Sequence, residues 1–104
     1  MRNTHSVTTT VPTDHRLVIE RLAAAIRSRF RTRGLTIGDR WIGCRTRISW
    51  ASWGEDIHVD VTRRTAGSSA VTITSTSVLP VVRNDWGTNR RNVERLLGAL
   101  YDEP

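Results

Sequence analysis

The chain has 104 residues, of which 16 are basic and ten are acidic, so its formal net charge at pH 7 is +6. All of the basic residues are arginine, and none is lysine. A surplus of positive charge favours an acidic or phosphate-bearing partner. The complete replacement of lysine by arginine is also what a GC-rich genome produces, so it indicates no function by itself.

The sequence argues against several classes of protein. Its single cysteine, Cys44, excludes a disulfide within the chain and a zinc site built from cysteines. No apolar run approaches the roughly 18 residues of a membrane-spanning helix. The first ten residues lack the apolar stretch of a signal peptide. We therefore expect a cytoplasmic protein that does not associate with membranes.

Residues 1–12 are rich in threonine and show no periodicity, so we expect a flexible tail, followed by a single α+β domain over residues 13–104. Pro12-Thr13-Asp14 is a helix-start signal with Thr13 or Asp14 as the N-cap. Apolar residues then recur at helical spacing up to Phe30. Gly34 is placed to end this helix as a glycine just past its last turn.

From residue 35 onward the apolar period changes to two, which is typical of strands. Apolar and polar residues alternate over 40–50, 55–63 and 70–79, with turn residues around Gly54 and Gly67. Residues 35–37 or 80–83 could add one short strand. A last amphipathic helix follows, with Thr88 as its expected cap and an apolar stripe from Val93 to Tyr101.

The expected element order is therefore α-β-β-β-α. Two amphipathic helices and a sheet with one apolar face can bury their apolar sides only against one another. We predict a two-layer α+β sandwich in which an antiparallel sheet of three to four strands carries both helices on one face.

The strand pattern also predicts which side chains share the other face of the sheet. Pairing Trp50 with Glu55 across the first turn places Arg45 opposite Asp60, and pairing Val61 with Val71 across the second places His58 opposite Thr74. One face is then polar and free for solvent or a partner. Its expected members are Arg45, Arg47, Asp56, His58, Asp60, Thr72, Thr74 and Thr76.

Asp56-x-His58-x-Asp60 puts three ionisable side chains on this face. A carboxylate beside a histidine can orient a general base or contribute to a metal site. Each carboxylate also has an arginine within cross-strand reach, however, and a flat sheet face lacks a catalytic cleft. The sequence contains no glycine-rich phosphate loop, nucleophile elbow or zinc-ligand spacing. We expect no enzymatic activity, no metal and no cofactor.

Six residues are the candidates for binding an anion. Arg45 and Arg47 lie on the polar face, and Arg90 and Arg91 fall in the first turn of the last helix if Thr88 caps it, where free N–H groups attract anions. Trp41 and Trp53 are candidates for stacking on bases. The arginines from Arg27 to Arg33 need no function, because the helix dipole stabilises positive charge at a C-terminus.

The C-terminal quarter of the chain carries a more definite motif. Ser75-Thr76-Ser77 is followed by Asp85-Trp86-Gly87-Thr88-Asn89 and an amphipathic helix. This stretch resembles the ending of a bacterial family of unknown function, with a Ser-x-Ser strand, an Asp-x-Gly-x-Asn turn and a helix. The resemblance implies a fold element and no activity. In physical terms, Asp85 could form an Asx-turn and Thr88 or Asn89 could cap the helix.

The sequence thus predicts a small non-enzymatic module that binds an anionic partner, with nucleic acid bound through its backbone as the first candidate. No helix-turn-helix, zinc finger or RNA-recognition signature indicates base-specific reading. The alternative is a protein-interaction or assembly subunit that docks an acidic or other protein through its threonine-rich sheet face or an edge strand.

Overall fold

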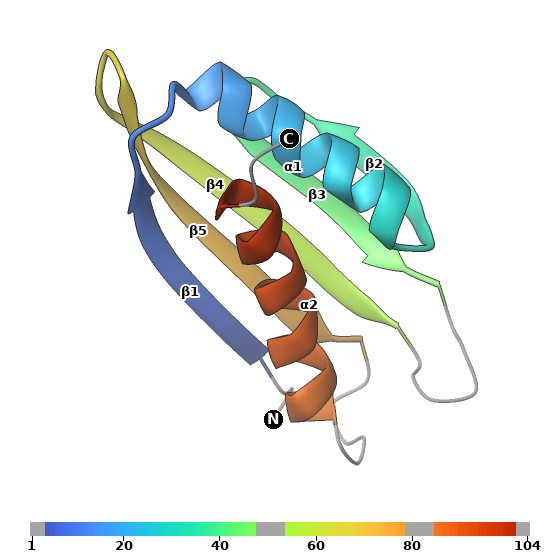
Figure 1. Ribbon diagram of the computed structural model, residues 1–104. Helices are drawn as coiled ribbons and strands as arrows, with labels where there is room; N and C mark the ends of the chain where they lie inside the picture. The colour runs from blue at the N-terminus through green and yellow to red at the C-terminus, as the bar shows by residue number, and fades with distance from the viewer. Residues whose placement is uncertain (1–3, 48–53, 79–84, 102–104) are drawn as a thin grey trace.

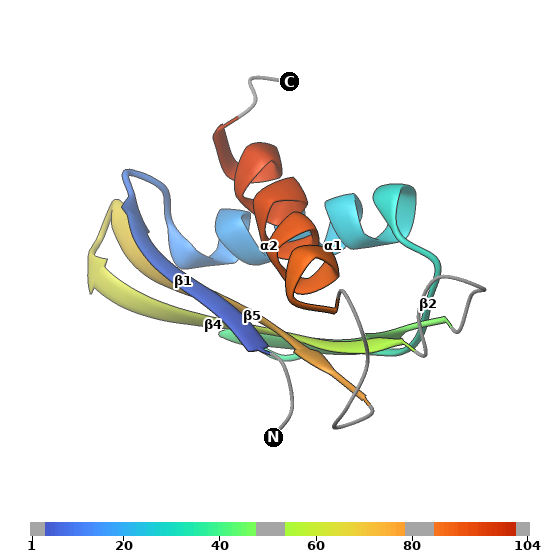
Figure 2. The same cartoon turned by 90° about the horizontal axis from the view of Figure 1, so that it is seen from below.

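The computed structural model describes residues 4–47, 54–78 and 85–101. Its elements in chain order are β1 (Thr4–Val11), α1 (His15–Arg29), β2 (Thr32–Ile37), β3 (Trp41–Thr46), β4 (Glu55–Thr65), β5 (Ser68–Ser77) and α2 (Asp85–Tyr101). The five strands form one antiparallel sheet in the order β1-β5-β4-β3-β2, and both helices cover the same face of it (Figures 1 and 2). The α+β class and the placement of the helices are confirmed, whereas the strand number was underestimated.

The main addition is β1, because Thr4–Val11 had been expected to form a flexible tail. This segment instead pairs with β5 over eight consecutive positions, from Thr4 opposite Thr76 to Val11 opposite Ser69. Three hydroxyl pairs join the strands on the exposed face, between Thr4 and Thr76, Ser6 and Thr74, and Thr8 and Thr72. The expectation of a tail was wrong because threonine suits either side of a strand and leaves little alternation to detect.

Helix α1 begins where the sequence predicts and ends earlier. Asp14 is the N-cap, and its side chain accepts a hydrogen bond from the backbone N–H of Arg16. The helix ends at Arg29, and Gly34 lies within β2 with φ of +65°. The prediction that Gly34 ends the helix was therefore wrong. The short strand proposed for 35–37 exists and starts at Thr32, whereas the one proposed for 80–83 lies outside the described residues.

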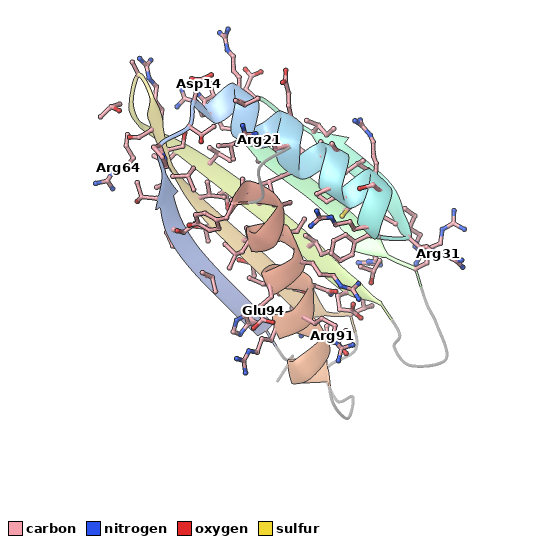
Figure 3. The ribbon with its side chains drawn as sticks, in the orientation of Figure 1. Asp14, Arg21, Arg31, Arg64, Arg91 and Glu94 are labelled. Carbon is pink, nitrogen blue, oxygen red and sulfur yellow. The ribbon has the colours of Figure 1, made fainter. Side chains whose placement is uncertain are left out.

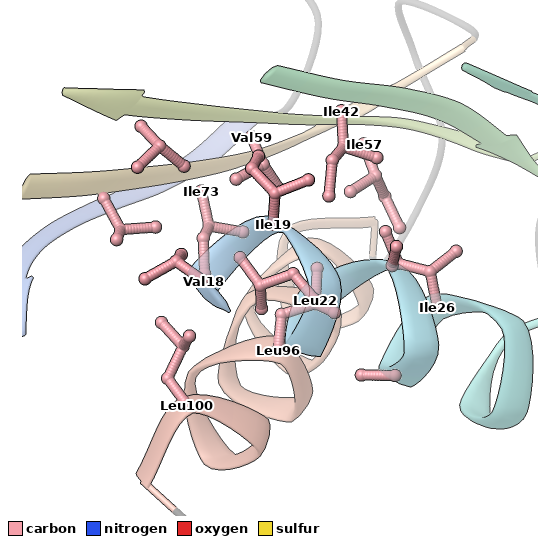
Figure 4. Packing of buried hydrophobic residues seen from close by; sticks show 14 of the residues in the cluster. Val18, Ile19, Leu22, Ile26, Ile42, Ile57, Val59, Ile73, Leu96 and Leu100 are labelled. Atoms are coloured by element: carbon pink, nitrogen blue, oxygen red, sulfur yellow. The ribbon is translucent and has the colours of Figure 1, made fainter. Parts of the chain in front are cut away.

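The hydrophobic core lies between the sheet and the helices. Leu22 and Ile26 of α1, and Leu96 of α2, are fully buried in one cluster with Ile57, Val59 and Ile73 of the central strands (Figure 4). These residues form one continuous cluster. Burial of this kind stabilises a domain by roughly 25 cal/mol per Å² of apolar surface. The core leaves the opposite face of the sheet to polar side chains.

The strand register was predicted correctly for one hairpin and incorrectly for the other. Val61 lies opposite Val71 and His58 opposite Thr74, as expected. Arg45, however, lies opposite Asp56 and not Asp60, a shift of four residues along β4. Because the shift is an even number, every side chain keeps its predicted face. We call the face that carries Arg45, His58 and the β1–β5 hydroxyl pairs the polar sheet face.

Candidate functional site

Four arginines lie close together where β2 begins and the neighbouring β3 ends. Arg33 lies directly opposite Arg45 in the β2–β3 pairing. The backbone N–H of Arg47 donates to the carbonyl of Arg31 at 2.9 Å, so the same pairing continues and places Arg31 opposite Arg47. All four residues are exposed. We call Arg31, Arg33, Arg45 and Arg47 the arginine cluster.

Like charges directly opposite each other destabilise a pair of strands. One carboxylate relieves part of this repulsion. Arg45 donates from Nε to Asp56 Oδ1 at 2.7 Å and from Nη2 to Oδ2 at 3.3 Å. The hydrogen bonds that Arg45 donates to Asp56, and then the charge of this carboxylate, raise the pKa of Arg45 further above its already high value. Arg45 is therefore charged at every physiological pH.

An open pocket of about 520 Å³ lies beside the cluster. Its lining includes Arg33, Arg45, Asp56 and His58, with Gly43 between them. Gly43 lies opposite His58, so the absence of a side chain there leaves room in the middle of the polar sheet face. A molecule bound in this pocket would meet two guanidinium groups, an imidazole and the Asp56 carboxylate, which is already paired with Arg45.

An aromatic pair borders the same surface. The rings of Trp41 and His58 are stacked, with centroids 6.3 Å apart and planes inclined by 16°. His58 Nε2 lies 3.1 Å from Asp60 Oδ2, which holds the imidazole in place. Any side chain at Gly38 would collide with the indole. Trp41 is 40% exposed and is therefore a preorganised aromatic surface that a planar group could contact.

The structure brings three of the six candidate residues onto one surface. Arg45, Arg47 and Trp41 belong to β3 or directly follow it. Trp53 lies outside the described residues.

Arg90 and Arg91 lie elsewhere. They are on α2, in the helix layer on the other side of the sheet, and Figure 3 shows Arg91 on that helix, away from Arg31, which directly precedes β2. Because α2 begins at Asp85, both residues fall in its second turn, and the expectation that Thr88 caps the helix was wrong. Arg90 Nε also pairs with Glu94 Oε1 at 2.9 Å. The two arginines therefore do not lie in the first turn of the helix, where they had been expected, and anion binding by them stays a prediction.

Sequence reasoning missed Arg31 and Arg33. Both had been assigned to the end of the first helix, where positive charge needs no further explanation. The signal that could have placed them correctly is the β-branched content of residues 32–37, where Thr32, Thr36 and Ile37 favour a strand over a helix.

The Ser-x-Ser and Asn motif has a structural role of its own. The Ser75 hydroxyl donates to Asn89 Oδ1 at 2.7 Å, and Asn89 Nδ2 donates to Ser77 Oγ at 3.0 Å. All three side chains are fully buried. Asn89 lies inside α2, so the expected capping role is replaced by a connection from the helix to β5.

The same connection extends to two more strands. Asn92 Nδ2 donates to Ser75 Oγ at 3.2 Å and to Glu55 Oε1 at 2.8 Å. The Thr46 hydroxyl donates to Glu55 Oε1 at 3.2 Å, and the Glu55 backbone N–H donates to Thr46 Oγ1 at 2.8 Å. Buried polar groups that are hydrogen-bonded to one another fix a unique packing. This buried polar network therefore attaches α2 to β3, β4 and β5 and lies beneath the polar sheet face.

The remaining ionisable groups form no metal site within the described residues. No group of three or more His, Cys, Asp or Glu side chains in 4–47, 54–78 and 85–101 is arranged to hold a metal ion. In the Asp56-x-His58-x-Asp60 sequence, Asp56 pairs with Arg45 while His58 pairs with Asp60.

Neither helix is long and apolar enough to cross a lipid bilayer, as judged over the described part of the chain. The sequence matches no protein-family model, and a search of curated proteins found no significant match.

Proposed function

We propose that this protein is a non-enzymatic module that binds an anionic polymer on its polar sheet face, with single-stranded nucleic acid as the partner. The observation that carries the proposal is the arginine cluster. Two arginine pairs occupy neighbouring cross-strand positions at a cost in sheet stability. A phosphate group between them would relieve the repulsion, and guanidinium groups bind phosphate in a bidentate manner.

The shape and chemistry of the surrounding surface favour nucleic acid over an acidic protein. The pocket beside the cluster is open, which admits a polymer. The Trp41–His58 stack lies on the same face and offers a surface for an unpaired base. A basic surface combined with aromatic stacking is the usual means of binding single strands without sequence preference. This partner also agrees with the cytoplasmic location that we propose for the protein.

The proposal is tested by tryptophan-fluorescence titration with single- and double-stranded oligonucleotides over a series of salt concentrations. Counterion release predicts a linear decrease of log K with log salt, with a slope of about −0.7 for each phosphate contacted on a single strand. The double variant Arg33→Glu/Arg47→Glu should weaken binding at least about tenfold and flatten the slope, because it reverses two of the contacts.

A matched control is available on the helix layer. Arg16→Glu/Arg91→Glu changes the net charge by the same amount at two exposed positions on α1 and α2, so its effect should be small. Asp56→Asn should increase affinity, because it releases Arg45 from its carboxylate partner. Absence of binding at low salt would refute the proposal, and equal losses in both double variants would show that only net charge matters.

A further inference from the structure

Strand β1 forms one edge of the sheet. It pairs with β5 on one side, and no described strand or helix of residues 4–47, 54–78 and 85–101 pairs with its other side (Figure 1). An edge strand presents a row of N–H and C=O groups that can pair with another strand. The question is therefore whether this edge is protected against such pairing.

Two features protect the opposite edge, and β1 lacks both. Strand β2 contains a charged residue, Arg33, and Gly34 with φ of +65°, and its register shifts between Arg33 and Thr36. Charges and bulges of this kind are how sheets prevent edge-to-edge association. The eight residues of β1 include no arginine, aspartate, glutamate, proline or glycine, and their pairing with β5 shows no shift. Strand β1 is thus an edge with regular pairing and with no arginine or carboxylate.

The distribution of charge indicates what could occupy this edge. The chain carries a net charge of +6, so two copies repel each other over most of their surface. The arginine cluster lies at the opposite edge of the sheet, beside β2. A second copy therefore meets less repulsion at the β1 edge than at the β2 edge.

The helix layer supplies a neighbouring apolar contact. Tyr101, at the end of α2, is 58% exposed, and its hydroxyl lies 2.6 Å from Thr9 Oγ1 of β1. This ring is the most exposed of the large hydrophobic side chains described. A copy that approaches β1 would cover the ring as well as the strand.

We propose that the protein forms a two-fold symmetric dimer in which β1 pairs antiparallel with β1 of a second copy. Antiparallel pairing of a strand with itself is self-complementary, as a two-fold interface requires. The two five-stranded sheets become one continuous sheet, and both polar sheet faces then lie on the same side. The two arginine clusters lie at its outer ends. The dimer does not depend on anion binding.

Sedimentation velocity from low micromolar to submillimolar concentrations tests the dimer. The expected result is a mass that rises with concentration from 11.8 kDa towards twice that value. Ser6→Lys/Thr8→Lys adds charge to two exposed positions of β1 and should weaken association at least about tenfold, because lysines then face each other across the two-fold axis. Circular dichroism confirms that the variant is folded.

The matched control is Thr36→Lys/Ile37→Lys, which adds the same charge to exposed positions on the other edge and should leave association unchanged. Hydrogen exchange on the unmodified protein supplies a readout without variants, since the amides of residues 4–11 that point away from β5 should become more protected as the concentration rises. A mass of 11.8 kDa at every concentration would overturn the proposal and leave the edge to a strand from another protein. A dimer broken only by the β2 lysines would overturn it as well.

Discussion

The position of Cys44 in the sheet decides how reactive its thiol is. It lies on β3 and is only 8% exposed, on the side of the sheet that faces the core. Burial, and then the nearby negative charge of Asp56, raise the pKa of its thiol from 9.0 to about 11. The thiolate is the reactive form of cysteine, so Cys44 is chemically inert in the folded protein at neutral pH.

A pH dependence of stability follows from this shift. In the unfolded chain the thiol loses its proton near pH 9, whereas in the folded protein it keeps the proton until about pH 11. The contribution of Cys44 to the free energy of unfolding is therefore complete below pH 9 and is lost as the pH rises to about 11. Urea denaturation at pH 8 and in this interval measures the effect.

Cys44→Ala provides the control for the alkaline loss. Other groups titrate in the same interval, and the variant retains their contributions while removing that of the thiol. The difference between the two proteins should therefore shrink as the pH rises. A constant difference would contradict the assignment, and so would rapid reaction of the native protein with a thiol reagent at pH 8.

At the scale of the element, α2 is held by buried polar contacts as well as by its apolar stripe. Asn89 is fully buried and joins the hydroxyls of Ser75 and Ser77. Asn89→Ala should lower the free energy of unfolding by about 1–3 kcal/mol or more, because it removes the partner of two buried hydroxyl groups. Denaturation monitored by circular dichroism measures this loss.

The neighbouring position offers a control on the same helix. Arg90 is exposed and pairs with Glu94 one turn later. Exposed pairs of this kind contribute about 0.3–0.5 kcal/mol, so Arg90→Ala should have a small effect. Equal losses in the two variants would show that the buried polar network adds nothing beyond ordinary helix stability.

At the scale of the whole molecule, stability depends on the apolar layer between sheet and helices. Leu22 is fully buried in it, whereas Leu17 on the same helix is 40% exposed. Leu22→Ala should cost about 2–5 kcal/mol through lost burial and the cavity that remains. Leu17→Ala should cost much less. Urea denaturation of both variants tests whether α1 packs on the sheet through the face that carries Leu22. A larger loss of stability for Leu17→Ala than for Leu22→Ala would show that it does not.

Much of this architecture could be predicted from single segments. The alternation of Ile57, Val59 and Val61 with polar residues identifies a half-buried strand, because burial of one face requires period two. Asp14 likewise marks the start of α1, since its side chain satisfies a backbone N–H of the first turn. Arg45 could be assigned to the polar face for the same reason, even though its cross-strand partner was predicted incorrectly.

Other features depended on contacts between distant segments. The helical spacing of apolar residues continues to Phe30, whereas in the structure α1 ends at Arg29 and Thr32 and Arg33 already pair with β3. That pairing creates the arginine cluster. The sequence therefore predicted only two of its four members, Arg45 and Arg47. The connection of Asn89 to Ser75 and Ser77 depends in the same way on where α2 lies relative to β5.

The sequence by itself determined the faces of the strands and the two-layer class, because both follow from which side chains can be buried. Only the tertiary structure decided the register of β3 against β4, the incorporation of Thr4–Val11 as an edge strand and the meeting of Arg31 with Arg47. The physical reason is that burial acts on each segment separately and fixes which face a side chain occupies. A period of two still allows a register to shift by an even number of residues, and strand order depends on hydrogen bonds between segments that are distant in the sequence.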